Sequence, residues 1–202
     1  MSSSDQVATD SSSPPNESPP VTGRRRSRTR VVTEWLVIIA VAVGVSFTIR
    51  TYAFQTFSIP SGSMQPTLQV GDRIIVNKLS SRFGAIHIGD ILVFRAPPAV
   101  ATNCGDTVAD LVKRVIGVPG DHLTTRGNTI YVNGKPLREA WTHYEPLGVA
   151  IGSVTVQPGH FFMMGDNHSD SCDSRSWGQV PRSDIIGKAF LRIWPLGRVG
   201  SL

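Results

Sequence analysis

One long apolar run constrains this chain more than any other part of its sequence. It reads WLVIIAVAVGVSFTIRTYAF from Trp35 to Phe54, and the stretch from Trp35 to Ile49 carries no charge. That uncharged core is slightly short of the roughly 20 apolar residues that span a bilayer as a helix. Arg50 can extend its guanidinium to the lipid–water interface, which allows the aromatic residues up to Phe54 to complete the segment. We therefore expect a transmembrane anchor over residues 31–54.

The residues before the run indicate its orientation. Arginines are concentrated in GRRRSRTR, residues 23–30. Such a cluster can bind nucleic acid, but beside an apolar segment it points to the positive-inside rule, with the N-terminus in the cytoplasm and residues 55–202 outside. A cleaved secretory signal has a similar layout. We favour a retained anchor, because Arg50 and bulky aromatic residues stand where a small-x-small cleavage site would follow.

The residues before this cluster are dominated by Ser, Pro and acidic side chains, with almost nothing to bury. This composition is typical of disorder. Residues 1–30 as a whole are therefore predicted to form a disordered, basic, cytoplasmic tail.

Residues 55–202 have the features of a β-rich domain. Short β-prone runs alternate with turn signals such as Gly71-Asp72 and Gly89-Asp90, and Asn133-Gly134 predicts a type I′ hairpin. The predicted strands are Arg73–Val76, Ile91–Phe94, Leu111–Val118, Thr129–Val132, Ser153–Val156, Phe161–Met164 and Ala189–Ile193. The predicted fold class is mainly β, an antiparallel barrel or sandwich-like domain behind a single N-terminal transmembrane helix.

Lys113 lies in one of these β-prone runs, between apolar residues. Alternate residues of a strand share a face, so Lys113 has apolar neighbours on one face and Arg114 has them on the other. An edge strand that carries protective charges explains this pattern, and so does a buried lysine. Burial would lower the lysine pKa and leave a neutral amine that can act as a general base.

A general base needs a group to activate, and the segment IPSGSMQPTL, residues 59–68, offers Ser63. Pro60 and Pro66 keep this segment from being helical, and Gly62 permits close backbone approach. A serine held in such a turn can present its hydroxyl as a nucleophile and its N–H as half of an oxyanion hole. By itself the segment fits an ordinary linker equally well.

A third stretch, MMGDNHSDSCDSR from Met163 to Arg175, runs from an apolar strand into short polar side chains. It fits a surface loop that forms hydrogen bonds with itself, and the spacing of a calcium loop is missing. The histidines and cysteines of the chain also lack the spacing of metal ligands. We therefore expect no metal and no cofactor.

Taken in order, these segments resemble a type I signal peptidase, the bacterial membrane-bound leader peptidase. The resemblance extends from the anchor to Trp194-Pro195, and it rests on the ordered set of motifs rather than on any one of them. The matching motifs are Ser61–Met64, Pro66–Leu68, Gly71-Asp72, Gly89–Phe94, Lys113–Gly117, Pro119–Asp121, Gly165–Asn167 and Ser171–Arg175.

The resemblance implies a Ser/Lys dyad, in which Ser63 is the nucleophile and Lys113 is the general base. Ser61 matches the position whose hydroxyl completes the oxyanion hole with the Ser63 N–H. Ser171 matches the serine that orients the lysine amine. The matching supporting residues are Arg114, Asp173 and Arg175, of which the last two form an ion pair. The residues that match pockets for small side chains, one and three positions before the cut, are Phe57, Ile59, Met64, Leu68 and Val112.

The function implied is that of a membrane-bound serine endopeptidase that removes signal peptides from exported pre-proteins. Its expected partners are signal-peptide-bearing pre-proteins and the lipid bilayer, with no nucleic acid and no metal. Its expected location is the bacterial cytoplasmic membrane, as a single-pass protein whose catalytic domain is extracytoplasmic. The substrate would dock as an extended strand beside the segment before Ser63.

Two departures from the family pattern lie in the third stretch. His168-Ser169-Asp170 replaces residues that are commonly arginine and other polar types, and Cys172 replaces a small apolar residue. Because Cys104 and Cys172 are both expected outside the cytoplasm, we hypothesise a disulfide between them; two buried thiols are the alternative. Two other functions stay open, namely a protease with His168 as its base, acting on a serine or on Cys172, and a membrane-tethered binding module.

Overall fold

The computed structural model describes residues 28–105, 107–142 and 146–202. Most of the predicted cytoplasmic tail lies outside the described residues. The chain divides into two units between Ala42 and Val43, and each is described by itself.

Helix α1 (Arg28–Ala53) covers the predicted anchor. Its segment Thr29–Phe47 has a mean hydropathy of 1.9 and is entirely unburied. A helix of this length and composition can cross a membrane, so α1 is consistent with membrane anchoring. The aromatic residue Phe54 does not extend the helix but begins strand β1, where it pairs with Asn77.

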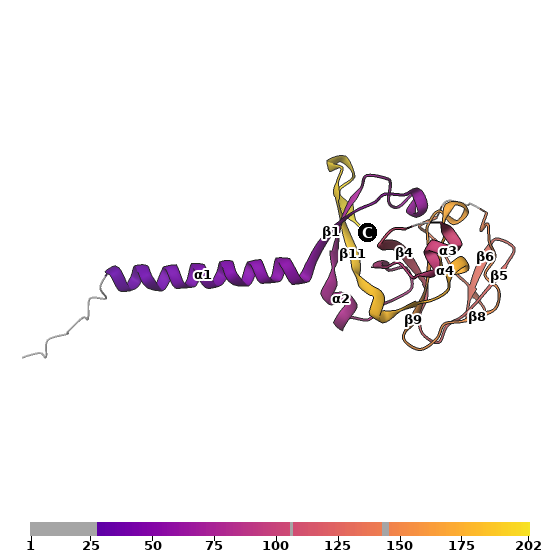
Figure 1. The fold of residues 1–202 in the computed structure, drawn as a ribbon, viewed down its shortest axis with the longest axis horizontal. Helices are drawn as coiled ribbons and strands as arrows, with labels where there is room; N and C mark the ends of the chain where they lie inside the picture. The colour runs from indigo at the N-terminus through magenta and orange to yellow at the C-terminus, as the bar shows by residue number, and fades with distance from the viewer. Residues whose placement is uncertain (1–27, 106, 143–145) are drawn as a thin grey trace, which may run out of the picture. The chain divides into compact units, whose positions relative to one another are not determined.

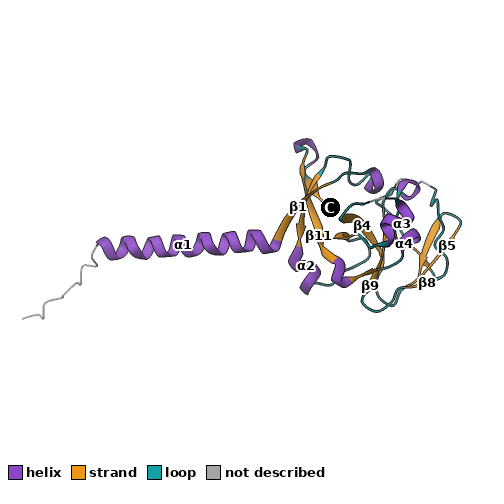
Figure 2. Ribbon diagram, in the orientation of Figure 1, coloured by secondary structure: helices purple, strands orange, loops and turns teal. Residues whose placement is uncertain are grey.

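The strands form two sheets, and all the described pairings are antiparallel (Figures 1 and 2). The eight-stranded sheet consists, in spatial order, of β1 (Phe54–Ser58), β2 (Arg73–Asn77), β11 (Ile185–Trp194), β3 (Ile91–Arg95), β4 (Asp110–Gly117), β9 (His160–Met164) and β10 (Val180–Pro181), with β12 (Gly200–Ser201) beside β11. The four-stranded sheet consists of β7 (Lys135–Pro136), β6 (Thr129–Val132), β5 (His122–Arg126) and β8 (Val154–Thr155). The prediction of a mainly β, antiparallel fold is confirmed.

Short helices connect the strands. The α-helices after the anchor are α2 (Lys78–Phe83), α3 (Ala99–Cys104) and α4 (Ser174–Trp177). Single 3-10 turns occur at η1 (Gly62–Met64), η2 (His168–Asp170), η3 (Arg182–Asp184) and η4 (Leu196–Arg198). The turn η1 corrects the expectation that the proline-flanked segment is not helical. A 3-10 turn needs only three residues, so Gly62–Met64 can form it without involving Pro60 or Pro66.

All seven predicted strands are present, and the hairpin at Asn133-Gly134 is confirmed. Both of its residues have positive φ, 51° and 78°, as a type I′ turn requires. The sequence did not reveal β1, because its residues continue the apolar run of the anchor. It also did not reveal β5, because most of the side chains of this strand are polar and only Leu123 among them is buried.

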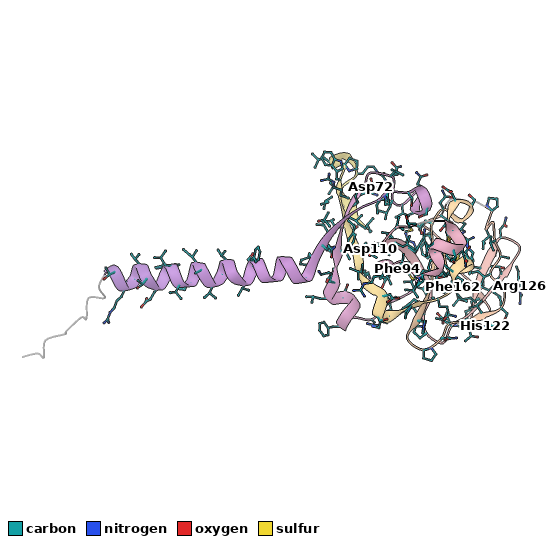
Figure 3. All side chains as sticks on the ribbon, viewed as in Figure 1. Asp72, Phe94, Asp110, His122, Arg126 and Phe162 are labelled. Atoms are coloured by element: carbon teal, nitrogen blue, oxygen red, sulfur yellow. A yellow bond between two sulfur atoms is a disulfide. The ribbon has the colours of Figure 1, made fainter. Side chains whose placement is uncertain are left out.

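The hydrophobic core of the domain packs against the segment that carries Ser63. Strand β3 buries four consecutive residues, Ile91–Phe94, because both faces of the large sheet are covered there. One buried cluster contains Ile59, Met64 and Leu68 together with residues of β2 and β3. Figure 3 labels Phe94 and Asp110 within the large sheet and His122 and Arg126 on the small one. The predicted nucleophile turn therefore rests on the core of the large sheet.

Candidate active site

Ser63 lies in the turn η1, which residues distant in sequence hold in place. The Asn167 N–H donates a hydrogen bond to the carbonyl of Ser63 at 3.1 Å, and the Asn167 amide donates to the carbonyl of Gly62 at 3.3 Å. Within the turn, the Gln65 N–H donates to the Gly62 carbonyl at 3.0 Å. The backbone carbonyls around the serine are thereby fixed, and its hydroxyl is left to interact elsewhere.

The hydroxyl of Ser63 contacts the amine of Lys113. Lys113 Nζ lies 2.6 Å from Ser63 Oγ, across 50 residues of sequence. Lys113 is only 2% exposed, and it lies on β4 opposite Leu92 of β3. The interpretation of Lys113 as an exposed, protective charge on an edge strand is wrong, because its side chain is buried, although β9 pairs with β4 only from Arg114 onward. Both Lys113 and Arg114, on opposite faces of this strand, are buried.

Two further serines lie near the nucleophile turn. Ser61 Oγ is 3.3 Å from Ser63 Oγ. Ser171 approaches the same turn from the far side of Gly165, where an added Cβ would overlap both the Ser63 carbonyl oxygen and the Ser171 hydroxyl. Ser171 Oγ is buried and has no hydrogen-bond partner among the described residues. The structure thus brings both predicted serines to the site.

Arg114 has a partner that sequence reasoning missed. Its guanidinium donates two hydrogen bonds to the Asp166 carboxylate, at 2.8 and 2.7 Å, and both side chains are buried. Thr67 also donates to Asp166, at 2.5 Å, and the ring of Trp141 lies 4.6 Å from the guanidinium carbon. Asp166 and Thr67 both belong to matching motifs, which was the signal available in the sequence. This network connects β4 to the segment that follows the nucleophile turn, through Thr67, and to the loop after β9, through Asp166.

Asp173 and Arg175 form the ion pair that the resemblance implies. Their closest N···O distance is 2.7 Å, and the pair is almost entirely buried. Asp173 also caps α4 by accepting from the Arg175 N–H, and it accepts from the Gly165 N–H at 3.2 Å. Arg175 in turn donates to the backbone carbonyls of His168 and Ser171 at 2.9 and 3.2 Å. The pair therefore holds the loop that backs the nucleophile turn.

A cavity of about 430 Å³ opens beside Ser61 and Ser63. Most of the predicted pocket residues line it, namely Phe57, Ile59, Met64 and Val112. Leu68 is not among the lining residues. It is fully buried in the cluster beneath, where its N–H donates to the Met64 carbonyl at 2.8 Å. Leu68 therefore supports the wall of the cavity rather than forming its surface.

Two strand edges flank this cavity. Strand β1 is the terminal strand of the large sheet and pairs with β2. On β4, residues Asp110–Arg114 pair with β3, and β9 pairs with the other edge at Arg114, Val115 and Gly117. Among the described strands, the edge from Asp110 to Lys113 is therefore available to an added strand.

The cysteines and His168 have other partners. Cys104 at the end of α3 forms a disulfide with Cys172, with a Cα–Cα distance of 6.0 Å, so the hypothesised disulfide is present. His168 is 4% exposed, and its Nε2 lies 3.3 Å from Glu139 Oε1. This geometry disfavours a protease with Cys172 as nucleophile or His168 as base.

Comparison with known proteins gives consistent results. The model of a family described as "Signal peptidase, peptidase S26" matches residues 32–194. A signal peptidase I of Leptolyngbya laminosa is 36% identical over 198 residues, which cover 97% of each chain. A probable signal peptidase I-2 of Synechocystis is 40% identical over 172 residues, covering 83% of this chain and 77% of the relative. A signal peptidase I of Mycobacterium tuberculosis is 36% identical, covering 87% and 77%.

Among solved structures, the crystal structure of a signal peptidase I from Enterococcus faecalis is similar to this chain. The two share 28% sequence identity with a TM-score of 0.42, over 52% of this chain and 96% of the other.

Proposed function

The chain belongs to the signal peptidase family, peptidase S26, and is a serine endopeptidase that cleaves signal peptides; from this premise we propose that Ser63 is its nucleophile and Lys113 its general base. The observation that carries the proposal is the 2.6 Å contact between Lys113 Nζ and Ser63 Oγ. It joins a nucleophile and a base at hydrogen-bond distance, as activation of a serine requires.

Burial of Lys113 supports its role as a base. A buried amine loses the hydration that stabilises its charged form, so the neutral form is favoured. The neutral amine takes the Ser63 proton as the Ser63 oxygen attacks the scissile carbonyl, and it later gives that proton to the leaving amine. Water then hydrolyses the acyl-enzyme with Lys113 again accepting a proton.

Ser61 and the Ser63 N–H are proposed to hold the oxyanion that forms in this attack. The Ser61 hydroxyl lies near the nucleophile, 3.3 Å from Ser63 Oγ, and it comes from the residue that precedes η1. Donors fixed in advance at this point stabilise the transition state, and removing one such donor typically costs about 100- to 1000-fold in kcat.

The substrate is proposed to add as a strand between β1 and the available edge of β4. In this position every second side chain of the substrate points into the cavity that Phe57, Ile59, Met64 and Val112 line. The bulk of these residues restricts the cavity, which supports selection of small residues at the first and third positions before the cut.

We further propose that α1 is a single membrane span with the N-terminus in the cytoplasm and the catalytic domain outside. The arginine-rich segment at residues 23–30 supports this orientation. The Cys104–Cys172 disulfide supports an oxidising compartment for the domain. The bacterial cytoplasmic membrane is the corresponding location.

Protease added to sealed, right-side-out vesicles should digest the catalytic domain and leave the N-terminus protected.

Cleavage of a pre-protein by the full-length, detergent-solubilised protein tests the dyad. Ser63→Ala and Lys113→Ala should each lower the rate by at least about 1000-fold. Lys113→Arg should be equally inactive, because a guanidinium stays protonated and cannot act as a base. Ser153→Ala and Lys135→Ala, which change exposed residues of the same types, serve as matched controls and should retain the rate.

Two outcomes would contradict the dyad. One is an active Lys113→Ala enzyme combined with an inactive His168→Ala enzyme of unchanged circular dichroism, which would favour the histidine as base. The other is the absence of cleavage by the unmutated protein, which would favour a membrane-tethered binding module.

A further inference from the structure

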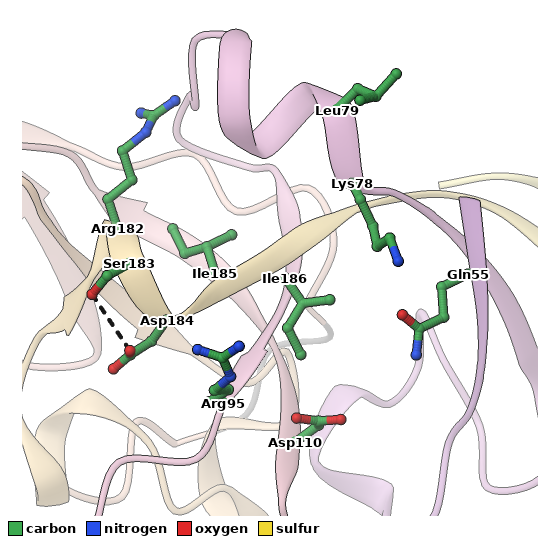
Figure 4. A pocket seen from close by; sticks show the side chains of 10 residues that line it. All are labelled: Gln55, Lys78, Leu79, Arg95, Asp110, Arg182, Ser183, Asp184, Ile185 and Ile186. Carbon is green, nitrogen blue, oxygen red and sulfur yellow. Dashed lines mark hydrogen bonds between the residues drawn. The ribbon is translucent and has the colours of Figure 1, made fainter. Parts of the chain in front are cut away.

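A second hollow, of about 900 Å³, adjoins the proposed substrate cavity. Residues that line it include Gln55, Lys78, Arg95, Asp110 and Arg182, and we call this hollow the upstream pocket. Figure 4 shows that these residues come from β1, α2, β3, β4 and the segment before β11, and that the Arg182 side chain points away from Arg95 and Asp110. Asp110 lines both this pocket and the substrate cavity. The two hollows are therefore neighbours along the same groove.

The strand register shows why the two hollows differ in polarity. Val93 of β3 pairs with Val112 of β4, and both line the substrate cavity. Two positions further along, on the same face of the sheet, Arg95 pairs with Asp110, and both line the upstream pocket. The groove thus changes from an apolar row to a charged row within two residues of each strand.

Strand β1 shows the same change on the opposite side of the groove. Phe57 lines the substrate cavity, whereas Gln55, two residues earlier and on the same face, lines the upstream pocket. An extended strand advances about 3.3 Å per residue, so each residue of a substrate strand alongside β1 lies beside one residue of β1. The substrate cavity, which Phe57 lines, is proposed to take the first and third positions before the cut, so the residues beside Gln55, two or more positions further upstream, lie about five to seven positions before the cut.

The charges of the upstream pocket indicate which side chains suit it. The described residues that line it include three cations, Lys78, Arg95 and Arg182, and two carboxylates, Asp110 and Asp184. Arg182 donates to the Gly84 carbonyl at 2.7 Å, and Asp184 accepts from Ser183 at 3.4 Å, as Figure 4 shows for the second contact. Lys78 lies near Gln55, and the exposed Arg95 lies near Asp110, so both cations are close to the expected path of the substrate.

We propose that the upstream pocket is a specificity subsite for the signal-peptide residues about five to seven positions before the scissile bond, and that it favours acidic over basic side chains there. The proposal rests on the proposed function, because the direction of the groove is taken from Ser63. Lys78 and Arg95 are its specificity-determining residues, and they do not touch the reacting atoms.

Synthetic substrates of two lengths test the proposal with the full-length enzyme in detergent. The long substrates extend ten residues before the cut and carry Glu or Lys at the sixth position before it. The short substrate begins at the fourth position and cannot reach the pocket. The unmutated enzyme should cleave the Glu substrate about three to ten times more efficiently, in kcat/KM, than the Lys substrate.

The double variant Lys78→Glu/Arg95→Glu should reverse this preference and leave cleavage of the short substrate unchanged. The matched control is Arg126→Glu/Lys135→Glu, which makes the same change of charge on the four-stranded sheet. This control should keep the original preference. The short substrate also reports whether the pocket variant is folded.

The outcomes separate the subsite from its rivals. An unchanged preference in the pocket variant overturns the proposal. The proposal is also overturned if the pocket variant loses activity equally on short and long substrates in vesicles of anionic lipid but not in detergent. That result would assign the pocket to a lipid headgroup. A Ser63→Ala enzyme that still cleaves the short substrate contradicts the proposed function. The subsite is judged separately, from the charge preference that the unmutated enzyme and the pocket variant show on the long substrates.

Discussion

Gly165 lies between the predicted nucleophile turn and Ser171 of its supporting loop. A side chain there would meet the Ser63 carbonyl oxygen on one side and Ser171 on the other. Neither is the end of a flexible side chain, because one is backbone and the other a short serine in a braced loop. Only glycine fits this contact, which explains its place between a buried strand and a polar loop.

We therefore expect Gly165→Ala to displace the Ser63 turn and lower pre-protein cleavage strongly. Overpacking of this kind also costs about 1–3 kcal/mol of stability. Gly152→Ala is the matched control, because an added Cβ there meets nothing within 4 Å. Thermal unfolding and cleavage rates of both variants provide the measurement. Wild-type activity in Gly165→Ala would show that the contact does not position Ser63.

Ser171 gives a second prediction at the scale of a single residue. Its buried hydroxyl has no hydrogen-bond partner among the described residues, so Ser171→Ala removes no bond from the folded state and should leave the melting temperature nearly unchanged. If Ser171 orients the Lys113 amine, the same variant should lose up to about 100-fold in kcat. Loss of kcat together with loss of stability would instead indicate a structural role.

At the scale of elements, the loop between β9 and α4 organises the site. It supplies Asp166 to Arg114, Asn167 to the nucleophile turn, and Asp173 to both Arg175 and the backbone of Gly165. A loop of short polar side chains becomes rigid here because its charges are buried and paired, and buried charges without partners are costly.

Breaking the Asp173–Arg175 pair should therefore destabilise the domain. Asp173→Asn leaves the buried guanidinium without its carboxylate, and the expected cost is about 3–5 kcal/mol of unfolding free energy. A double-mutant cycle with Arg175→Gln isolates the interaction between the two residues. Urea unfolding of the four proteins measures it. Additive effects of the two substitutions would refute coupling across this pair.

At the scale of the whole molecule, the disulfide connects α3 to the loop that holds Ser171. Its cysteines are 68 residues apart in sequence. A crosslink restricts the unfolded chain, and a disulfide typically stabilises a fold by about 2–4 kcal/mol. The half-cystine next to Ser171 therefore ties the candidate site to a distant part of the domain.

Replacing both cysteines by alanine should lower the free energy of unfolding by that amount. Non-reducing mass spectrometry of the unmutated protein should find no free thiol, and chemical unfolding of the double variant gives the loss of stability. Two free thiols in the purified protein would contradict the disulfide. An unchanged unfolding midpoint would contradict its contribution to stability.

Features that depend on local pattern could be predicted from the sequence alone. The apolar run predicted the helix, alternating apolar residues and turn signals predicted the strands, and Asn133-Gly134 predicted the hairpin. The ordered motifs also singled out Ser63 and Lys113. However, the strand pattern assigns a residue to one face of the strand and does not show what covers that face. For this reason the sequence left Lys113 open between an edge strand and a buried position.

The contacts that join distant segments could be known only once the chain was folded. The fold placed Lys113 beside Ser63, where it is buried, and it paired β4 with β9 from Arg114 onward. The same pairing gave Arg114 its partner Asp166, and the strand register aligned Arg95 with Asp110. These outcomes depend on which strands become neighbours across tens of residues, and local periodicity carries no information about that choice.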